Sequence, residues 1–174
     1  MKRVVLALSV LAAHPLAATA QFAGLPADVQ AFHDAHGECD EADLLPEAIG
    51  PIVIPLGSER TMYLVPCYSG AYNVAHAAYV VDGSELKRHW FATYSDYDGW
   101  TATDIIVNPV WEGGGLGRLS MYNLGRGIGD CGSTATWQVA DGNLRMLKFT
   151  YKGDCDGEGE PGEFPVVFEA SPSE

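Results

Sequence analysis

The four cysteines are the residues whose chemistry this sequence predicts most directly. The chain has 174 residues, and its cysteines are Cys39, Cys67, Cys131 and Cys155. In an exported protein an even number of cysteines indicates disulfides, and four cysteines allow three pairings. Asp141-Gly142 has the sequence of a tight β-hairpin turn, which would bring the chain after Tyr151 back beside Cys131. We therefore expect Cys131–Cys155 and, by elimination, Cys39–Cys67.

A glycine-rich run lies around Cys131. Residues 127–132 match the pattern G-x-G-x-x-G, which in dinucleotide-binding proteins joins a strand to a helix and holds a pyrophosphate. Here residues 134–139 alternate between polar and apolar side chains, as a strand does, and Asp130 would repel a phosphate. We therefore predict no cofactor. We expect glycines at positive φ and an ion pair between Arg126 and Asp130 across the turn.

Acidic side chains in two glycine-containing stretches could bind calcium, which prefers hard oxygen ligands. One stretch is residues 96–99, and the other carries acids at alternate positions, namely Asp154, Asp156 and Glu158. Neither stretch has the full EF-hand pattern, and acidic loops are common in an acidic protein. We predict no metal site and keep the second stretch as a weak calcium candidate.

Nucleophilic catalysis has little support in the sequence. The chain lacks the G-x-S-x-G, H-E-x-x-H and C-x-x-C motifs and has no phosphate-binding P-loop. His76 and His89 fall on predicted strands, but no serine or acid can be assigned to either of them. An uncharacterised hydrolase stays an alternative, because catalytic triads are defined by position in space and not by order in the chain.

The N-terminal residues have the pattern of a cleaved signal peptide. Lys2 and Arg3 precede an apolar segment at residues 4–11, and Ala18-Thr19-Ala20 is a small-x-small cleavage site. The apolar segment is too short to span a bilayer comfortably, so we expect no membrane anchor. We predict a leader at residues 1–20 and a single disulfide-stapled domain at residues 21–174, located in the periplasm or secreted.

The charge of the chain favours some partners and argues against others. The formal net charge is −13, and the predicted leader carries two of the ten Lys and Arg and no acid, which leaves −15 on the domain. Such a surface repels nucleic-acid phosphates and anionic lipid head groups. A cationic partner would be attracted to it, although acidity can also simply keep an exported protein soluble.

The elements expected to position these residues are short and mostly extended. Pro26 and Asp28 begin a short helix that Gly37 ends, and this helix should act as a lid or brace. From residue 52 onward, about eight short apolar or alternating stretches are separated by turn signals, with no βα alternation. Asp82-Gly83 is one of these turns, and we expect it to pair residues 72–81 with a single strand over residues 86–94. A change of phase near Met146 indicates a β-bulge. We predict a mainly β fold, an antiparallel β-sandwich or barrel with one short N-terminal helix and two disulfides.

Several of these motifs together resemble a bacterial family of exported, cysteine-containing proteins, domain-of-unknown-function family 1176. The resemblance rests on the segments at residues 37–40, 66–73, 125–132, 155–157 and 164–165, together with Trp137. Members of that family usually have six cysteines and a longer chain. The resemblance implies export and disulfides, and it implies no particular activity.

A second and weaker resemblance is to periplasmic lysozyme inhibitors, which are small, acidic, disulfide-bonded β-barrels. Those proteins carry a Ser-Gly-x-x-Tyr loop and a nearby Lys-Gly pair. This chain has Ser69, Gly70 and Tyr72 in a run one residue shorter, and Lys152-Gly153. A Ser-Gly pair is more often just a turn. With Arg126 and Asp130, these three residues are our candidates for partner binding.

From these observations we expect an exported envelope protein without enzymatic activity, which binds a macromolecular partner. That partner is expected to be a protein or another envelope component, and a cationic one fits the charge. A lysozyme-inhibitor-like protein and an uncharacterised hydrolase are the alternatives.

Overall fold

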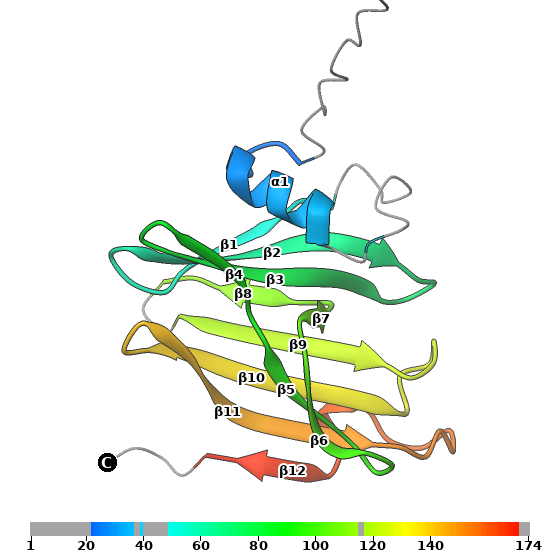
Figure 1. Cartoon of the computed structure of the whole chain (residues 1–174). Coiled ribbons are helices and arrows are strands. Elements are labelled where there is room, and N and C mark those ends of the chain that lie inside the picture. The colour runs from blue at the N-terminus through cyan, green and yellow to red at the C-terminus, as the bar shows by residue number, and fades with distance from the viewer. Residues whose placement is uncertain (1–21, 37–38, 40–48, 115–116, 171–174) are drawn as a thin grey trace, which may run out of the picture.

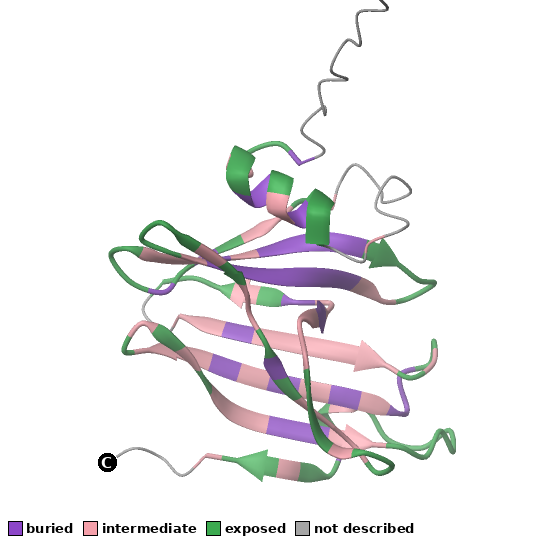
Figure 2. Ribbon diagram, viewed as in Figure 1, coloured by how far each residue is buried: buried purple, intermediate pink, exposed green. Residues whose placement is uncertain are grey.

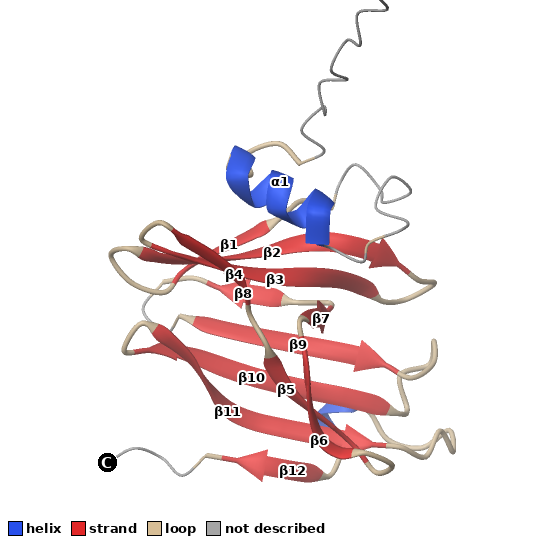
Figure 3. Cartoon of the chain, viewed as in Figure 1, coloured by secondary structure: helices blue, strands red, loops and turns tan. Residues whose placement is uncertain are grey.

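The computed structural model describes residues 22–36, 39, 49–114 and 117–170, and the predicted leader lies outside this part of the chain. The helices are α1 (Ala27–His36) and the 3-10 helix η2 (Pro161–Glu163). The strands are β1 (Ile52–Pro55), β2 (Arg60–Ser69), β3 (Val74–Asp82), β4 (Glu85–Arg88), β5 (Phe91–Ser95), β6 (Gly99–Thr103), β7 (Ile105–Val107), β8 (Val110–Glu112), β9 (Arg118–Leu124), β10 (Gly132–Ala140), β11 (Asn143–Lys152) and β12 (Val166–Glu169). In these residues the protein is mainly β with one short N-terminal α-helix, as predicted (Figure 3).

The strands form two five-stranded sheets and a two-stranded ribbon. In the first sheet the order is β1-β2-β3-β4, and β7 also pairs with β3. The second sheet has the order β12-β11-β10-β9-β8, and β5 and β6 form the ribbon. All these pairs are antiparallel. Figure 1 shows α1 above the first sheet and the second sheet below it.

The main hydrophobic core lies between the two sheets. Met62 and Leu64 of β2 are fully buried in it, and Leu119 of β9, Ala135 and Trp137 meet them from the second sheet. This inward set includes the alternating residues that the sequence predicted for β10 (Figure 2). No closed barrel forms among the described strands, and the sheets face each other as in a sandwich.

The outer face of the first sheet is covered by α1. Val29 of the helix is completely buried, and His33 Nδ1 lies 2.9 Å from the hydroxyl of Tyr79 on β3. The Cys39–Cys67 disulfide joins the segment after the helix to β2. The helix therefore braces the sheet, as its sequence predicted. None of the helices in the described residues is long and apolar enough to cross a membrane.

The turns of the final hairpin follow the sequence prediction. Asp141 and Gly142 connect β10 to β11 at φ angles of 51° and 74°, so both adopt the left-handed conformation of a tight hairpin turn. Thr136 pairs with Lys148 and Trp137 pairs with Met146, which leaves one extra residue on β11. This is the bulge expected near Met146.

One expected hairpin is wrong in part. The sequence suggested a single strand over residues 86–94, paired back across Asp82-Gly83. Instead β4 stays on β3, and the chain leaves the first sheet after His89, whose N–H donates to the Ala78 carbonyl. The chain then starts a separate strand, β5, which pairs with β6 and not with β3. Phe91 accounts for this departure, because its ring packs 5.2 Å from that of Trp137 between the sheets.

Candidate functional site

Three segments that are distant in the sequence meet at one end of the sandwich. They are the turn from β2 to β3 (residues 69–73), the connection from β9 to β10 (residues 124–131) and the segment that begins at the end of β11 (residues 152–160). We call these segments together the loop end, and in Figure 1 they lie on the right. Loops held by a rigid scaffold are where binding residues most often occur, so the loop end is our candidate site.

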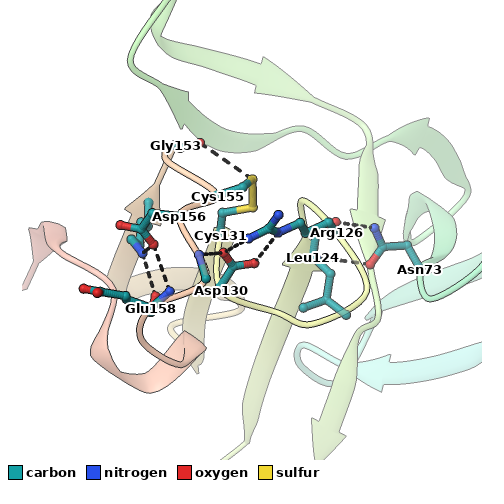
Figure 4. Close-up of a disulfide and its surroundings, with 11 residues drawn as sticks. Asn73, Leu124, Arg126, Asp130, Cys131, Gly153, Cys155, Asp156 and Glu158 are labelled. Carbon is teal, nitrogen blue, oxygen red and sulfur yellow. Dashed lines mark hydrogen bonds and ion pairs between the residues drawn. A yellow bond between two sulfur atoms is a disulfide. The ribbon is translucent and has the colours of Figure 1, made fainter.

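Asn73 joins the first two segments of the loop end. Its side-chain nitrogen donates to the Leu124 carbonyl oxygen at 2.8 Å, and its side-chain oxygen accepts from the Leu124 N–H at 3.2 Å (Figure 4). The Asn108 amide also donates to the Asn73 side-chain oxygen, at 2.9 Å. The sequence does not predict this role, because an asparagine in a turn gives no signal of a contact some fifty residues away.

The second and third segments are joined by a disulfide and by a buried carboxylate. The Cys131–Cys155 bond forms as predicted, and the expected pair of Arg126 and Asp130 is present as well. Arg126 Nε and Nη2 donate to the two Asp130 oxygens at 2.7 and 2.5 Å, and the Gly157 N–H donates to the same carboxylate at 2.6 Å (Figure 4). The hydrogen bonds from Arg126 and then from Gly157 hold the pKa of Asp130 well below its usual range.

The glycines of the run serve the backbone. Gly132 has φ 133°, and a Cβ atom there would lie 2.0 Å from the Asn123 carbonyl oxygen. A Cβ atom on Gly125 would lie 2.7 Å from the sulfur of Cys131. The run leads into strand β10 and not into a helix, so the G-x-G-x-x-G pattern here lacks the geometry of a dinucleotide site.

The structure brings the candidate partner-binding residues together at the loop end. Ser69, Gly70 and Tyr72 are exposed, and the Tyr72 ring rests against Gly127. Arg126 and Asp130 lie beside them but are bonded to each other, so only the partly exposed guanidinium remains available for a partner. Two exposed apolar side chains that the sequence did not single out lie here as well. They are Tyr68, directly before the β2–β3 turn, and Ile128 in the β9–β10 connection, and they are 42% and 72% exposed.

The acidic stretch after β11 is used for local contacts. Asp156 accepts from Lys152 Nζ at 2.5 Å and from the Glu158 N–H at 3.0 Å, and the bond from Lys152 is the main reason why the pKa of Asp156 is lowered. Asp154 makes no side-chain hydrogen bond or ion pair with a described residue. Throughout residues 22–36, 39, 49–114 and 117–170, no three His, Cys, Asp or Glu side chains are grouped so that they could hold a metal ion. The weak calcium candidates are therefore not assembled into a site there.

His76 lies on β3, as predicted, whereas His89 lies in the connection between β4 and β5 and not on a strand. His76 is 5% exposed, its Nδ1 has no hydrogen-bond partner among the described residues, and burial lowers its pKa to about 4. The ring of His89 packs 4.7 Å from that of Phe91, and burial lowers its pKa to about 4 as well. Both imidazoles are therefore neutral at pH 7. Neither is hydrogen-bonded through its side chain to a described serine or acid, which is the contact that a triad requires.

Comparisons with known proteins agree with the motif resemblance. Uncharacterized protein YpfG of Escherichia coli (strain K12) is 21% identical over 119 residues, which cover 67% of this chain and 34% of that protein. The chain thus spans about a third of the length of this relative. No solved structure matches the chain. A family model described as "Protein of unknown function (DUF1176)" matches residues 4–171, nearly the whole chain, and the protein belongs to this family.

Proposed function

We propose that this protein is an exported, non-enzymatic binding domain of the cell envelope, and that it holds a macromolecular partner at the loop end. Two disulfides and the absence of free cysteines among the described residues fit an oxidising compartment, either the periplasm or the exterior. The function is a proposal about this domain alone and not about the longer relative.

One observation carries the proposal. At the loop end, apolar side chains are exposed on segments that are held in place by a disulfide, the ion pair between Arg126 and the buried Asp130, and the side-chain amide of Asn73. Tyr68, Tyr72 and Ile128 supply exposed apolar area, and aromatic residues are enriched among those that dominate binding energy. Because the segments are already ordered, a partner would lose little conformational entropy on binding.

The charge of the same end favours a basic partner. Residues 152–163 contain five acids and one lysine. Lys152 is bonded to Asp156, whereas Asp154 has no counter-ion among the described residues. Opposite charge speeds encounter and selects the partner, and its effect falls with ionic strength. We expect affinity for the partner to fall as salt concentration rises.

The proposal can be tested with a photo-crosslinking amino acid in exporting cells. It is placed at Ile128 of the loop end and, as the matched control, at Val53, an exposed residue of β1. Val53 lies away from the loop end, because it pairs with Tyr63, six residues before the end of β2 at Ser69. We expect a discrete adduct with a basic envelope protein from position 128 only. No adduct at 128, or the same adducts from both positions, would contradict the proposal.

The purified partner then provides a quantitative test. Tyr72→Ala is expected to weaken binding by about tenfold, which is the usual loss for an aromatic residue in an interface centre. Val53→Ser is expected to leave binding unchanged. Equal affinities of the two variants would mean that the partner binds elsewhere.

A basic lysozyme is a second, more specific candidate partner. The observation that favours it is that Ser69 and Gly70 are exposed at the tip of β2–β3 and that Lys152 lies at the same end. In a turbidity assay on a peptidoglycan suspension, the protein should inhibit a basic lysozyme stoichiometrically, and Tyr72→Ala should relieve the inhibition. Full lysis in the presence of a tenfold excess of protein would exclude this candidate and leave the general proposal standing.

A further inference from the structure

A cavity of about 310 Å³ opens between the two sheets, beside the loop end. Its inner wall includes Phe91, Ile106 and Trp137, which are at most 4% exposed. Tyr68 also lines the cavity and is 42% exposed, so it marks the mouth. Ligand-binding cavities start at roughly this volume, and a cavity of about half the size binds benzene.

The lining has a definite chemical character. None of the residues that line the cavity carries a charge, so a charged ligand would be desolvated there without a partner. Ser133 lines the cavity and is 5% exposed, and its hydroxyl makes no hydrogen bond with a described residue. Its neighbours in alternation, Ala135 and Trp137, both belong to the core between the sheets, so Ser133 faces inward too. An inward hydroxyl without a protein partner is a group that a ligand can satisfy.

We propose that this cavity binds an uncharged, mainly apolar small molecule, about the size of two to three aromatic rings or a chain of some ten carbons, with one polar group directed to Ser133. The apolar part lies against Phe91, Ile106 and Trp137. The ligand enters past Tyr68. This inference goes beyond the proposed macromolecular partner and does not depend on it.

The first experiment titrates the exported protein with N-phenyl-1-naphthylamine, an uncharged probe with three aromatic rings whose fluorescence rises in apolar surroundings. Ala92→Phe places a ring at an exposed position of the cavity lining, and Ala31→Phe places the same ring at an exposed position of α1 as a matched control. We expect saturable binding of the probe, a Kd raised at least about tenfold by Ala92→Phe, and a Kd within about twofold of wild type for Ala31→Phe.

A second measurement locates the probe. After the leader is removed, the methionines are Met62, Met121 and Met146, and Met121 is the one that lines the cavity. With methyl-labelled methionine, the probe should shift the NMR signal of Met121 selectively. Absence of saturable binding, equal affinity of the two phenylalanine variants, or binding without a shift at Met121 would overturn the proposal.

The polar group is tested by displacement of the probe. 1-Octanol is expected to displace it, and Ser133→Ala should weaken the displacement by roughly fivefold, as the loss of one hydrogen bond predicts. Octanoate, which has a charge on a similar chain, should displace the probe poorly from wild type. Octanoate that displaces it as well as octanol does would refute the assignment of an uncharged ligand.

Discussion

Removing the Cys131–Cys155 disulfide with C131A/C155A is expected to lower the free energy of unfolding by about 3.5 kcal/mol. The two residues are 24 apart in the sequence, and opening a loop of this length returns about 12 cal/mol/K of entropy to the unfolded chain. At 298 K this corresponds to the stated loss. The figure is a large share of the total stability of a domain of this size.

The assay is urea unfolding followed by tryptophan fluorescence. With a slope of about 2 kcal/mol per molar urea, the midpoint should fall by somewhat less than 2 M. C39A/C67A opens a loop with a separation of 28 residues and should lose a similar amount. The two variants should differ in hydrogen exchange. We expect C131A/C155A to expose amides of residues 125–131, whereas C39A/C67A leaves them protected.

A loss below about 1 kcal/mol at an unchanged slope would refute this reasoning, because the disulfide would then not constrain the unfolded chain. A double-mutant cycle checks the native side independently. Gly125→Ala places a Cβ atom 2.7 Å from the Cys131 sulfur, so it should destabilise the wild type more than it destabilises C131A/C155A. If Gly125→Ala lowered the free energy of unfolding equally in both backgrounds, the close approach to the Cys131 sulfur would not be the reason why position 125 needs a glycine.

Three further predictions concern buried polar groups. Folding lowers the pKa of Asp130, so the stability that this carboxylate contributes to the folded state is present above its unfolded pKa of about 4 and is lost as pH falls. Asp130→Asn breaks the pair with Arg126 and should therefore make the melting temperature depend less on pH below pH 4. Folding lowers the pKa of His76 to about 4, so between pH 6.5 and pH 4 the unfolded chain binds a proton at this residue that the folded chain does not. The melting temperature should therefore fall as pH drops from about 6.5 to about 4, and His76→Gln should make that fall shallower. Tyr79→Phe removes the hydrogen bond to His33 and should cost about 1–2 kcal/mol in urea unfolding, and an unchanged midpoint would contradict it.

Local signals in the sequence were enough to predict the stapled hairpin. A two-residue hairpin turn of this type needs two residues in the left-handed conformation, which Asp and Gly adopt readily. Asp141-Gly142 therefore predicted both the turn and the approach of Cys155 to Cys131. The bulge and the inward set of β10 followed from the period of two in strand side chains. The turn, the bulge and the inward-facing residues of β10 depend on residues close together in the sequence, so the local sequence pattern is enough to predict them.

Features that depend on packing between distant segments were not predicted. β8 has only three residues and β6 is largely exposed, so neither has a clear alternation. The departure of the chain after His89 is decided by the position of Phe91 against Trp137, a contact across the core. At the candidate site, the sequence supplied Tyr72 and Arg126 as separate candidates, and only the fold brings their segments side by side.

The pairing of the cysteines has a consequence for how the protein matures. The two bridges join consecutive cysteines and do not enclose one another, since Cys39 bonds to Cys67 and Cys131 bonds to Cys155. If the chain is exported as proposed, leaving a secretion channel N-terminus first, it exposes each thiol pair in turn before the next cysteine arrives. A simple thiol oxidase acting on the emerging chain would therefore produce the native connectivity, with no need for an isomerase to reshuffle it afterwards.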